Sequence, residues 1–400
     1  MTPTGLLLVL LAIEPDVQSL LERAAALPPE LNADVILRVL EAGKVNESEK
    51  ELELVEQAFR LAQQARLAAP LRYAAGVAPR TNSTIGTLAA ASELKLDRLS
   101  LSERALDKMI ALHPRLARDR FLSMEIAPPA APSCNDALVP RFEPYFRLLF
   151  AMLETGFSPD ERSSGQALRY VAGQLNSLTS PEQMEAAAAI LADAPLTSRE
   201  RAGLADALAS SLIRCRTTWR SFGRYQELAK AIDQVARRLS AAGESTEDLN
   251  RALASYIQKH QGVSPCEEAP IDYAFWSSPE SKQLWTRFEA LRSAEPGPAL
   301  RAFLNDLDRV PLNASWFHER MILARSLLTD IPAGPMRDEQ WEITLRLLSD
   351  SPLLSENPAA WLLEVREILK LPEAAVYVSR VGGARLQLMI EADKLLGPRK

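Results

Sequence analysis

The amino-acid sequence predicts an all-α protein, built as an irregular array of antiparallel helix pairs that is α-solenoid-like or divided into two to three helical lobes. Apolar residues recur at helical spacing through most of the chain, as Leu228, Ile232 and Val235 do. Helix start signals stand between these stripes, and alternating strand patterns are scarce. No strict repeat is visible, so we expect an irregular stack rather than a regular solenoid.

The first residues form a short apolar run, Leu6–Ile13, followed by helical sequence from Pro15. This run is too short to cross a bilayer, and it fits the hydrophobic region of a signal peptide with Ala12 near the cleavage point. The first five residues contain no Lys or Arg, so the basic beginning of a signal peptide is missing. We therefore interpret residues 1–14 as a signal or anchor segment; the alternative is that the run opens the first helix.

Two long interruptions divide the rest of the chain into helical blocks. Residues 127–137 contain Pro128, Pro129 and Pro132, which remove backbone donors and favour extended backbone, so we predict a Pro-rich linker. Residues 261–279 form a second long loop. The predicted helical blocks are residues 15–126, 138–260 and 280–400.

Helix boundaries within the blocks are marked by capping signals. Ser180 with Gln183, and Thr197 with Glu200, have the spacing of a capping box, and Gly243 follows a helical stripe as a C-terminal glycine would. The stretch 376–381 alternates like a strand, but helical sequence flanks it and no partner strand is evident. We expect at most a token strand.

Composition and motifs exclude several function classes. The net charge is −6 and basic residues are interleaved with acidic ones, which argues against a nucleic-acid partner. The three Cys and three His residues lack metal-site spacing, and His318-Glu319 fails as a zincin helix because Ile322 occupies the second ligand position. No nucleophile elbow or phosphate-binding loop is present. We predict no catalytic, metal or cofactor residues, no cofactor and no integral membrane helix.

An aromatic group stands in the second long loop. Tyr273, Phe275 and Trp276 lie between prolines rather than on a helical stripe. They are either a plug that covers the end of the helical stack, which we favour, or an exposed contact patch for a protein or peptide.

The three cysteines differ in context. Cys215 falls in helical sequence and is most simply a packed small hydrophobe. Cys134 and Cys266 each stand in one of the two loops, where the backbone can adjust to disulfide geometry. We predict a Cys134–Cys266 disulfide, which would require an oxidising compartment.

Three segments resemble an uncharacterised family of exported, all-helical bacterial proteins. They are Ala25-Ala26-Leu27-Pro28-Pro29-Glu30, Pro132-Ser133-Cys134-Asn135-Asp136-Ala137-Leu138 and Ala274-Phe275-Trp276-Ser277-Ser278-Pro279. The resemblance implies a signal peptide and one cysteine in each of the two matching loops. No activity is known for that family, so the resemblance implies a location, periplasmic or extracellular, and no function.

The resulting hypothesis is an exported helical scaffold or binding module that acts through its surface on another protein or peptide. One alternative is an enzyme whose carboxylates come from several helices of a toroid, since 52 acidic residues are present. Another is a cytoplasmic helical adaptor with reduced cysteines. The sequence favours a non-enzymatic role and does not predict the oligomeric state.

The disulfide gives a direct test of the sequence interpretation. A Cys134–Cys266 bridge would enclose 131 intervening residues, and the chain-entropy model assigns such a loop about 4–5 kcal/mol of stabilisation. Peptide mapping without reductant should recover the two cysteine-containing peptides linked. Alkylation of both thiols in protein from its native compartment would contradict the prediction.

Overall fold

The computed structural model describes residues 14–74, 84–124, 137–215, 225–261 and 314–397, with four isolated positions, 279, 282, 283 and 286. Most of these residues are helical, which confirms the all-α prediction. The sheet in this part of the chain is one antiparallel ribbon of β1 (Leu71–Tyr73) and β2 (Leu138–Pro140), with Arg72 opposite Val139. The alternating stretch at 376–381 is helical.

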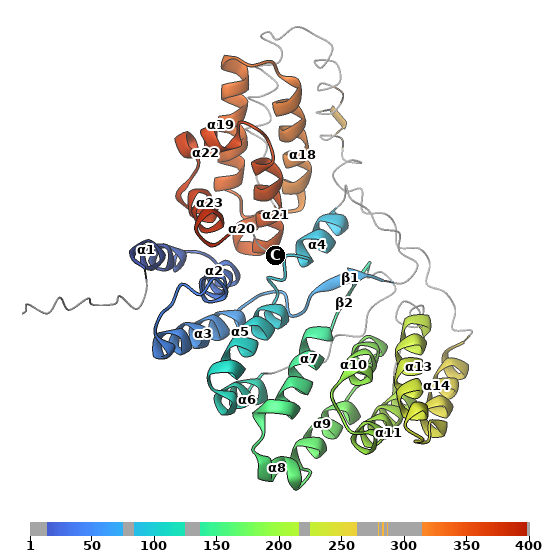
Figure 1. Ribbon diagram of the computed structural model, residues 1–400. Coiled ribbons are helices and arrows are strands. Elements are labelled where there is room, and N and C mark those ends of the chain that lie inside the picture. The colour runs from blue at the N-terminus through green and yellow to red at the C-terminus, as the bar shows by residue number, and fades with distance from the viewer. Residues whose placement is uncertain are drawn as a thin grey trace, which may run out of the picture.

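Ten helical segments form a two-layer array that runs across Figure 1 from α3 to α14, in which each helix packs on its neighbours in the same layer. One layer consists of α3 (Ser48–Ala62), α5 (Arg98–Leu112), α7 (Glu143–Ala151), α10 (Pro181–Asp193) and α13 (Tyr225–Ala241). The other consists of α6 (Pro114–Leu122), the π-helical turn η1 (Met152–Gly156), α9 (Gln166–Asn176), α11 (Ser198–Arg214) and α14 (Glu247–His260). The short helix α8 (Pro159–Ser163) packs on α9.

Local sequence explains where these helices begin and end. Both predicted capping boxes are present: the Ser180 hydroxyl accepts from the Gln183 backbone N–H, and Thr197 and Glu200 bond in the same way. Gly243 has a φ of 77°, a left-handed conformation that glycine adopts without the steric cost of a Cβ. These caps satisfy orphan backbone groups at the ends of the stacked helices.

The C-terminal helices pack against the N-terminal ones, so the first and last helices that the structure describes lie together (Figure 1). Helices α21 and α18 contact α4, and α23 contacts both α1 and α2. The N-terminal partners are α1 (Pro15–Ala24), α2 (Pro29–Glu41) and α4 (Thr84–Ser92). The C-terminal set is α18 (Ala314–Asp330), α19 (Pro335–Ser349), α20 (Leu353–Glu356), α21 (Pro358–Leu369), α22 (Ala374–Val381) and α23 (Ala384–Leu396).

Helix α2 lies at the centre of this junction. Every residue from Glu30 to Leu40 is buried, including the charged Glu30, Asp34 and Arg38. Helices α1, α3, α5, α21 and α23 all contact it. A helix that is buried on all sides must find internal partners for each of its charges.

None of the described helices combines the length and the apolar character that crossing a membrane requires.

The apolar stripe of α13 provides a stability test. Leu228, Ile232 and Val235 are fully buried against α10, as the sequence spacing predicted. Ile232→Asp places an unpaired charge in this interface and should cost several kcal/mol, roughly 3–5, of unfolding free energy. Urea denaturation followed by circular dichroism measures it. The matched control Gln234→Asp adds the same charge on the exposed face of α13, and equal effects of both substitutions would show that the stripe is not buried.

Candidate functional site

A charged cleft of about 800 Å³ opens where α2, α5, α7 and the end of α23 meet. We use the name charged cleft for this cavity and its lining. Four cationic side chains line it, namely Arg38, Lys95, Arg104 and Arg147. Four carboxylates line it as well, namely Asp34, Glu41, Glu103 and Asp107.

Arg104 of α5 holds two of these carboxylates on α2. Its Nη1 donates to Asp34 Oδ1 at 2.8 Å, and its Nε donates to Glu41 Oε1 at 2.9 Å. Burial opposes the charge of Arg104, but Asp34 and Glu41 outweigh this effect and raise the guanidinium pKa. The Asp34 carboxylate is almost completely buried, so the pair joins α2 firmly to α5.

Arg38 joins α2 to the C-terminal helix. Its side chain is 5% exposed, and its Nη2 lies 2.8 Å from Asp393 Oδ1. The same nitrogen donates to the carbonyls of Ala392, at 3.3 Å, and Gly397, at 2.5 Å. A cation at the carbonyl end of a helix also complements the helix dipole. Arg38 thereby places Leu396 of α23 in the wall of the cleft.

Arg147 and Glu103 form the next pair along the cleft. Arg147 Nη2 donates to Glu103 Oε2 at 2.9 Å, and its Nε also contacts this carboxylate. The hydrogen bond that Arg147 donates to Glu103 is the main cause that raises the pKa of Arg147. Asp107, one helical turn further along α5, is exposed and forms no ion pair with any residue that the structure describes. Desolvation, and then the charge of Glu103, raise the pKa of Asp107 to about 6, against the opposing effect of Arg147.

Lys95 has an unusual backbone. Its φ is 55°, and it is the one non-glycine residue with a positive φ in the part of the chain that the structure describes. It lies just after α4, where its N–H donates to Ser92 O at 3.1 Å, a position that glycine normally takes. Keeping a lysine there costs about 1 kcal/mol relative to glycine. The side chain is exposed and lines the cleft, and within the described segments it has no ion-pair partner.

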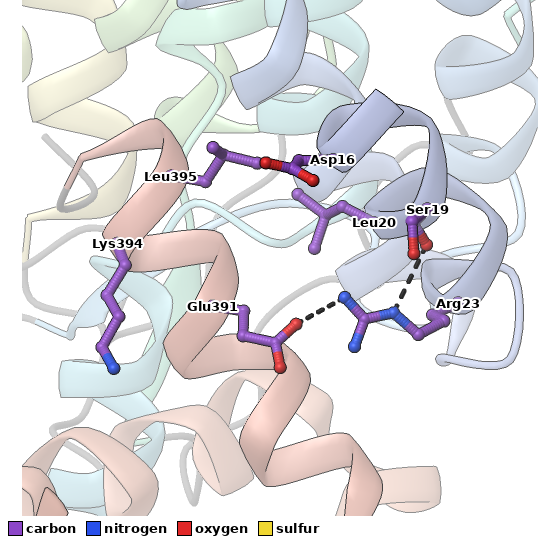
Figure 2. A pocket seen from close by; sticks show the side chains of 7 residues that line it. All are labelled: Asp16, Ser19, Leu20, Arg23, Glu391, Lys394 and Leu395. Carbon is purple, nitrogen blue, oxygen red and sulfur yellow. Dashed lines mark hydrogen bonds and ion pairs between the residues drawn. The ribbon is translucent and has the colours of Figure 1, made fainter. Parts of the chain in front are cut away.

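A second, shallower groove lies between α1 and α23 and encloses about 330 Å³. Figure 2 shows Arg23 reaching from α1 to Glu391 on α23, while its Nε also donates to the Ser19 carbonyl at 3.4 Å. Leu20 and Leu395 supply its apolar lining. Since its central charges satisfy each other, this groove is best explained as the seam between the first and last helices.

A small cavity of about 200 Å³ lies between α5 and the turn that joins α20 to α21. Asp97 lines it as the N-cap of α5, and its Oδ1 accepts from Ser100 N at 2.9 Å. The side chain is 2% exposed and its Oδ2 has no hydrogen-bond partner. Desolvation outweighs the hydrogen bonds from Ser100 and raises the pKa of Asp97 to about 6.

Cys215 is a buried thiol, which confirms its interpretation as a packed small side chain. It directly follows α11 rather than lying within a helix, and its Sγ lies 3.6 Å from Thr179 O. Burial, and then the charge of Glu182, raise the pKa of Cys215 to about 12, which is far from the thiolate that nucleophilic catalysis needs.

The site residues predicted from sequence lie outside the described residues. These are Cys134 and Cys266 of the predicted disulfide, and the aromatic group Tyr273, Phe275 and Trp276. The same holds for the apolar run Leu6–Ile13. The disulfide, the contact patch and export therefore stay predictions.

Sequence analysis missed the charged cleft because its lining comes from four separate segments. One local signal was available. Glu30, Asp34 and Arg38 recur every four residues within mostly apolar sequence, which places three charges on one face of a buried helix. Such a pattern indicates internal ion pairs but not their partners.

Within the described residues, no group of three His, Cys, Asp or Glu side chains is arranged to hold a metal ion. Searches of family models, curated proteins and solved structures gave no match to this chain.

Asp97 predicts a specific pH dependence. Its folded pKa of about 6 lies above the ordinary value of 3.8, so its contribution to stability is present below pH 3.8 and is lost as the pH rises through 6. Asn caps a helix without titrating. The unfolding free energy of Asp97→Asn minus that of wild type should therefore increase by up to about 3 kcal/mol between pH 4 and pH 7.5. Urea denaturation across this range tests it, and a constant difference would contradict the assignment.

Proposed function

We propose that this protein is an exported helical binding module that recognises a protein or peptide partner through the charged cleft. The observation that carries the proposal is the division of charge in the cleft. Asp34, Glu41 and Glu103 are already held by arginines from the same cleft. Lys95 and Asp107 form no ion pair with the other described residues of the cleft, so their charges are available to a ligand.

Ion pairs that are fixed by neighbouring helices favour recognition over acid–base catalysis. Carboxylates held by arginine are oriented and neutralised before any ligand arrives, which lowers the cost of forming a specific interface. A hydrolytic site instead needs two carboxyl groups free to contact the substrate and water. The export part of the proposal rests on the Leu6–Ile13 run and the predicted disulfide. An intact Met1 terminus in protein from its native cells would count against it.

Reversing the charges of Lys95 and Asp107, the two cleft residues without an ion pair among the described residues, tests the binding proposal. The variant Lys95→Glu with Asp107→Lys keeps the net charge and alters two exposed side chains. A control, Lys230→Glu with Asp233→Lys, makes the same exchange on the exposed face of α13, where it also removes the exposed Asp233–Arg237 ion pair. Affinity capture from the extracytoplasmic fraction should recover a protein with wild type and the control that the cleft variant loses. Recovery of the same proteins with all three would overturn the proposal.

The raised pKa of Asp107 favours one alternative, an enzyme with a dispersed carboxylate site. A carboxyl group with a pKa of about 6 beside a second carboxylate, Glu103, is the arrangement of a general acid. Hydrolysis of a panel of aryl glycosides by wild type and its loss in Asp107→Asn would establish this function. An unaltered rate in that variant, or no hydrolysis by wild type, would contradict the enzyme alternative.

A further inference from the structure

Six of the eight charges that line the cleft are matched within the protein. Arg104 is matched by Asp34 and Glu41, Arg147 by Glu103, and Arg38 by Asp393. An incoming ligand therefore meets two charged groups that form no ion pair among the described residues, the Lys95 ammonium and the Asp107 carboxylate. This part of the cleft complements a ligand that carries one negative and one positive group.

The separation of these two residues limits what the ligand can be. Lys95 lies just before the first residue of α5, Arg98, and Asp107 lies nine residues further along that helix. At a rise of about 1.5 Å per residue, the helix from Arg98 to Asp107 spans about 14 Å, and Lys95 precedes its first residue by three positions. The opposite charges of a free amino acid lie within one residue of each other and cannot reach both. An extended peptide of five residues places its end side chains about 13 Å apart.

The backbone of Lys95 is a second, independent observation. A left-handed position at the end of α4 favours glycine, yet the chain has lysine there. Non-glycine residues in this conformation cluster at functional sites, which points to a use for the Lys95 side chain. Ala42, Leu94 and Leu396 also line the cleft and offer apolar contact to a peptide.

We infer that the charged cleft binds an extended peptide segment of about five residues, with an acidic side chain at Lys95 and a basic side chain at Asp107. This inference rests on the proposed function and names the class of its ligand. Main-chain groups of the segment would lie over the α5 face of the cleft. The arginines and carboxylates that pair with each other fix the positions of the helices around the cleft.

The test is a switch of charge specificity with three end-blocked pentapeptides, Glu-Thr-Val-Thr-Lys, Lys-Thr-Val-Thr-Lys and Glu-Thr-Val-Thr-Glu. Titration calorimetry at low ionic strength measures their affinities for the full chain. Wild type should prefer the Glu…Lys peptide by about fivefold, the factor that one exposed ion pair supplies. Lys95→Glu should move the preference to the Lys…Lys peptide, and Asp107→Lys to the Glu…Glu peptide. The control Lys230→Glu should keep the wild-type order.

Lys95→Gly separates binding from folding. It relieves the left-handed strain, so it should raise Tm while it weakens binding of the Glu…Lys peptide about fivefold. Equal affinities of wild type for all three peptides, or an order unchanged by both charge reversals, would overturn the inference. If cleft-dependent capture succeeds while the peptides show no preference, the peptide assignment alone fails. If neither experiment depends on the cleft, the proposed function fails with it.

Discussion

Helix α2 is buried on every side from Glu30 to Leu40 although three residues of this stretch are charged, and this combination constrains the position of its neighbours. Glu30 accepts from the Arg66 backbone N–H at 2.9 Å, which fixes the segment after α3. Asp34 binds Arg104 of α5, and Arg38 binds Asp393 and the terminal carbonyls of α23. Removing one partner would leave a buried charge uncompensated, which is far more costly than losing an exposed ion pair.

The charged cleft follows from the same arrangement. At its C-terminal end α2 emerges from the junction, and Glu41 shares Arg104 with the buried Asp34. Most charged side chains of the cleft wall therefore form ion pairs that hold neighbouring helices together. Lys95 and Asp107 also line the cleft but take no part in these ion pairs. Such a division lets a rigid scaffold present a few adaptable groups to a ligand.

The fold class and helix ends could be predicted from sequence because they depend on local physics. The stripe that contains Ile232, the capping boxes at Ser180 and Thr197, and the glycine at 243 all lie where periodicity and capping rules place them. Those rules involve residues within about one or two helical turns.

The junction and the cleft could not be predicted in this way. Arg38 donates to the carbonyl of Ala392, 354 residues away in the sequence. Hydrophobic periodicity cannot predict a contact between residues so far apart. In the sequence Lys95 is indistinguishable from any other exposed lysine. Its left-handed backbone and its place in the cleft appear only in the structure. The three charges of α2 indicated burial with partners, but arginine is common in this chain, and nothing local distinguishes Arg104 from the others.

Hydrogen exchange of the full chain tests the central role of α2 most directly. If α2 is the buried junction, amides in residues 31–40 should exchange as slowly as those in residues 228–239 of α13, because both open only when the molecule unfolds as a whole. Mass spectrometry of peptic fragments compares the two segments in one sample. Rapid exchange in residues 31–40 while residues 228–239 stay protected would show that the junction opens independently, and would contradict the account.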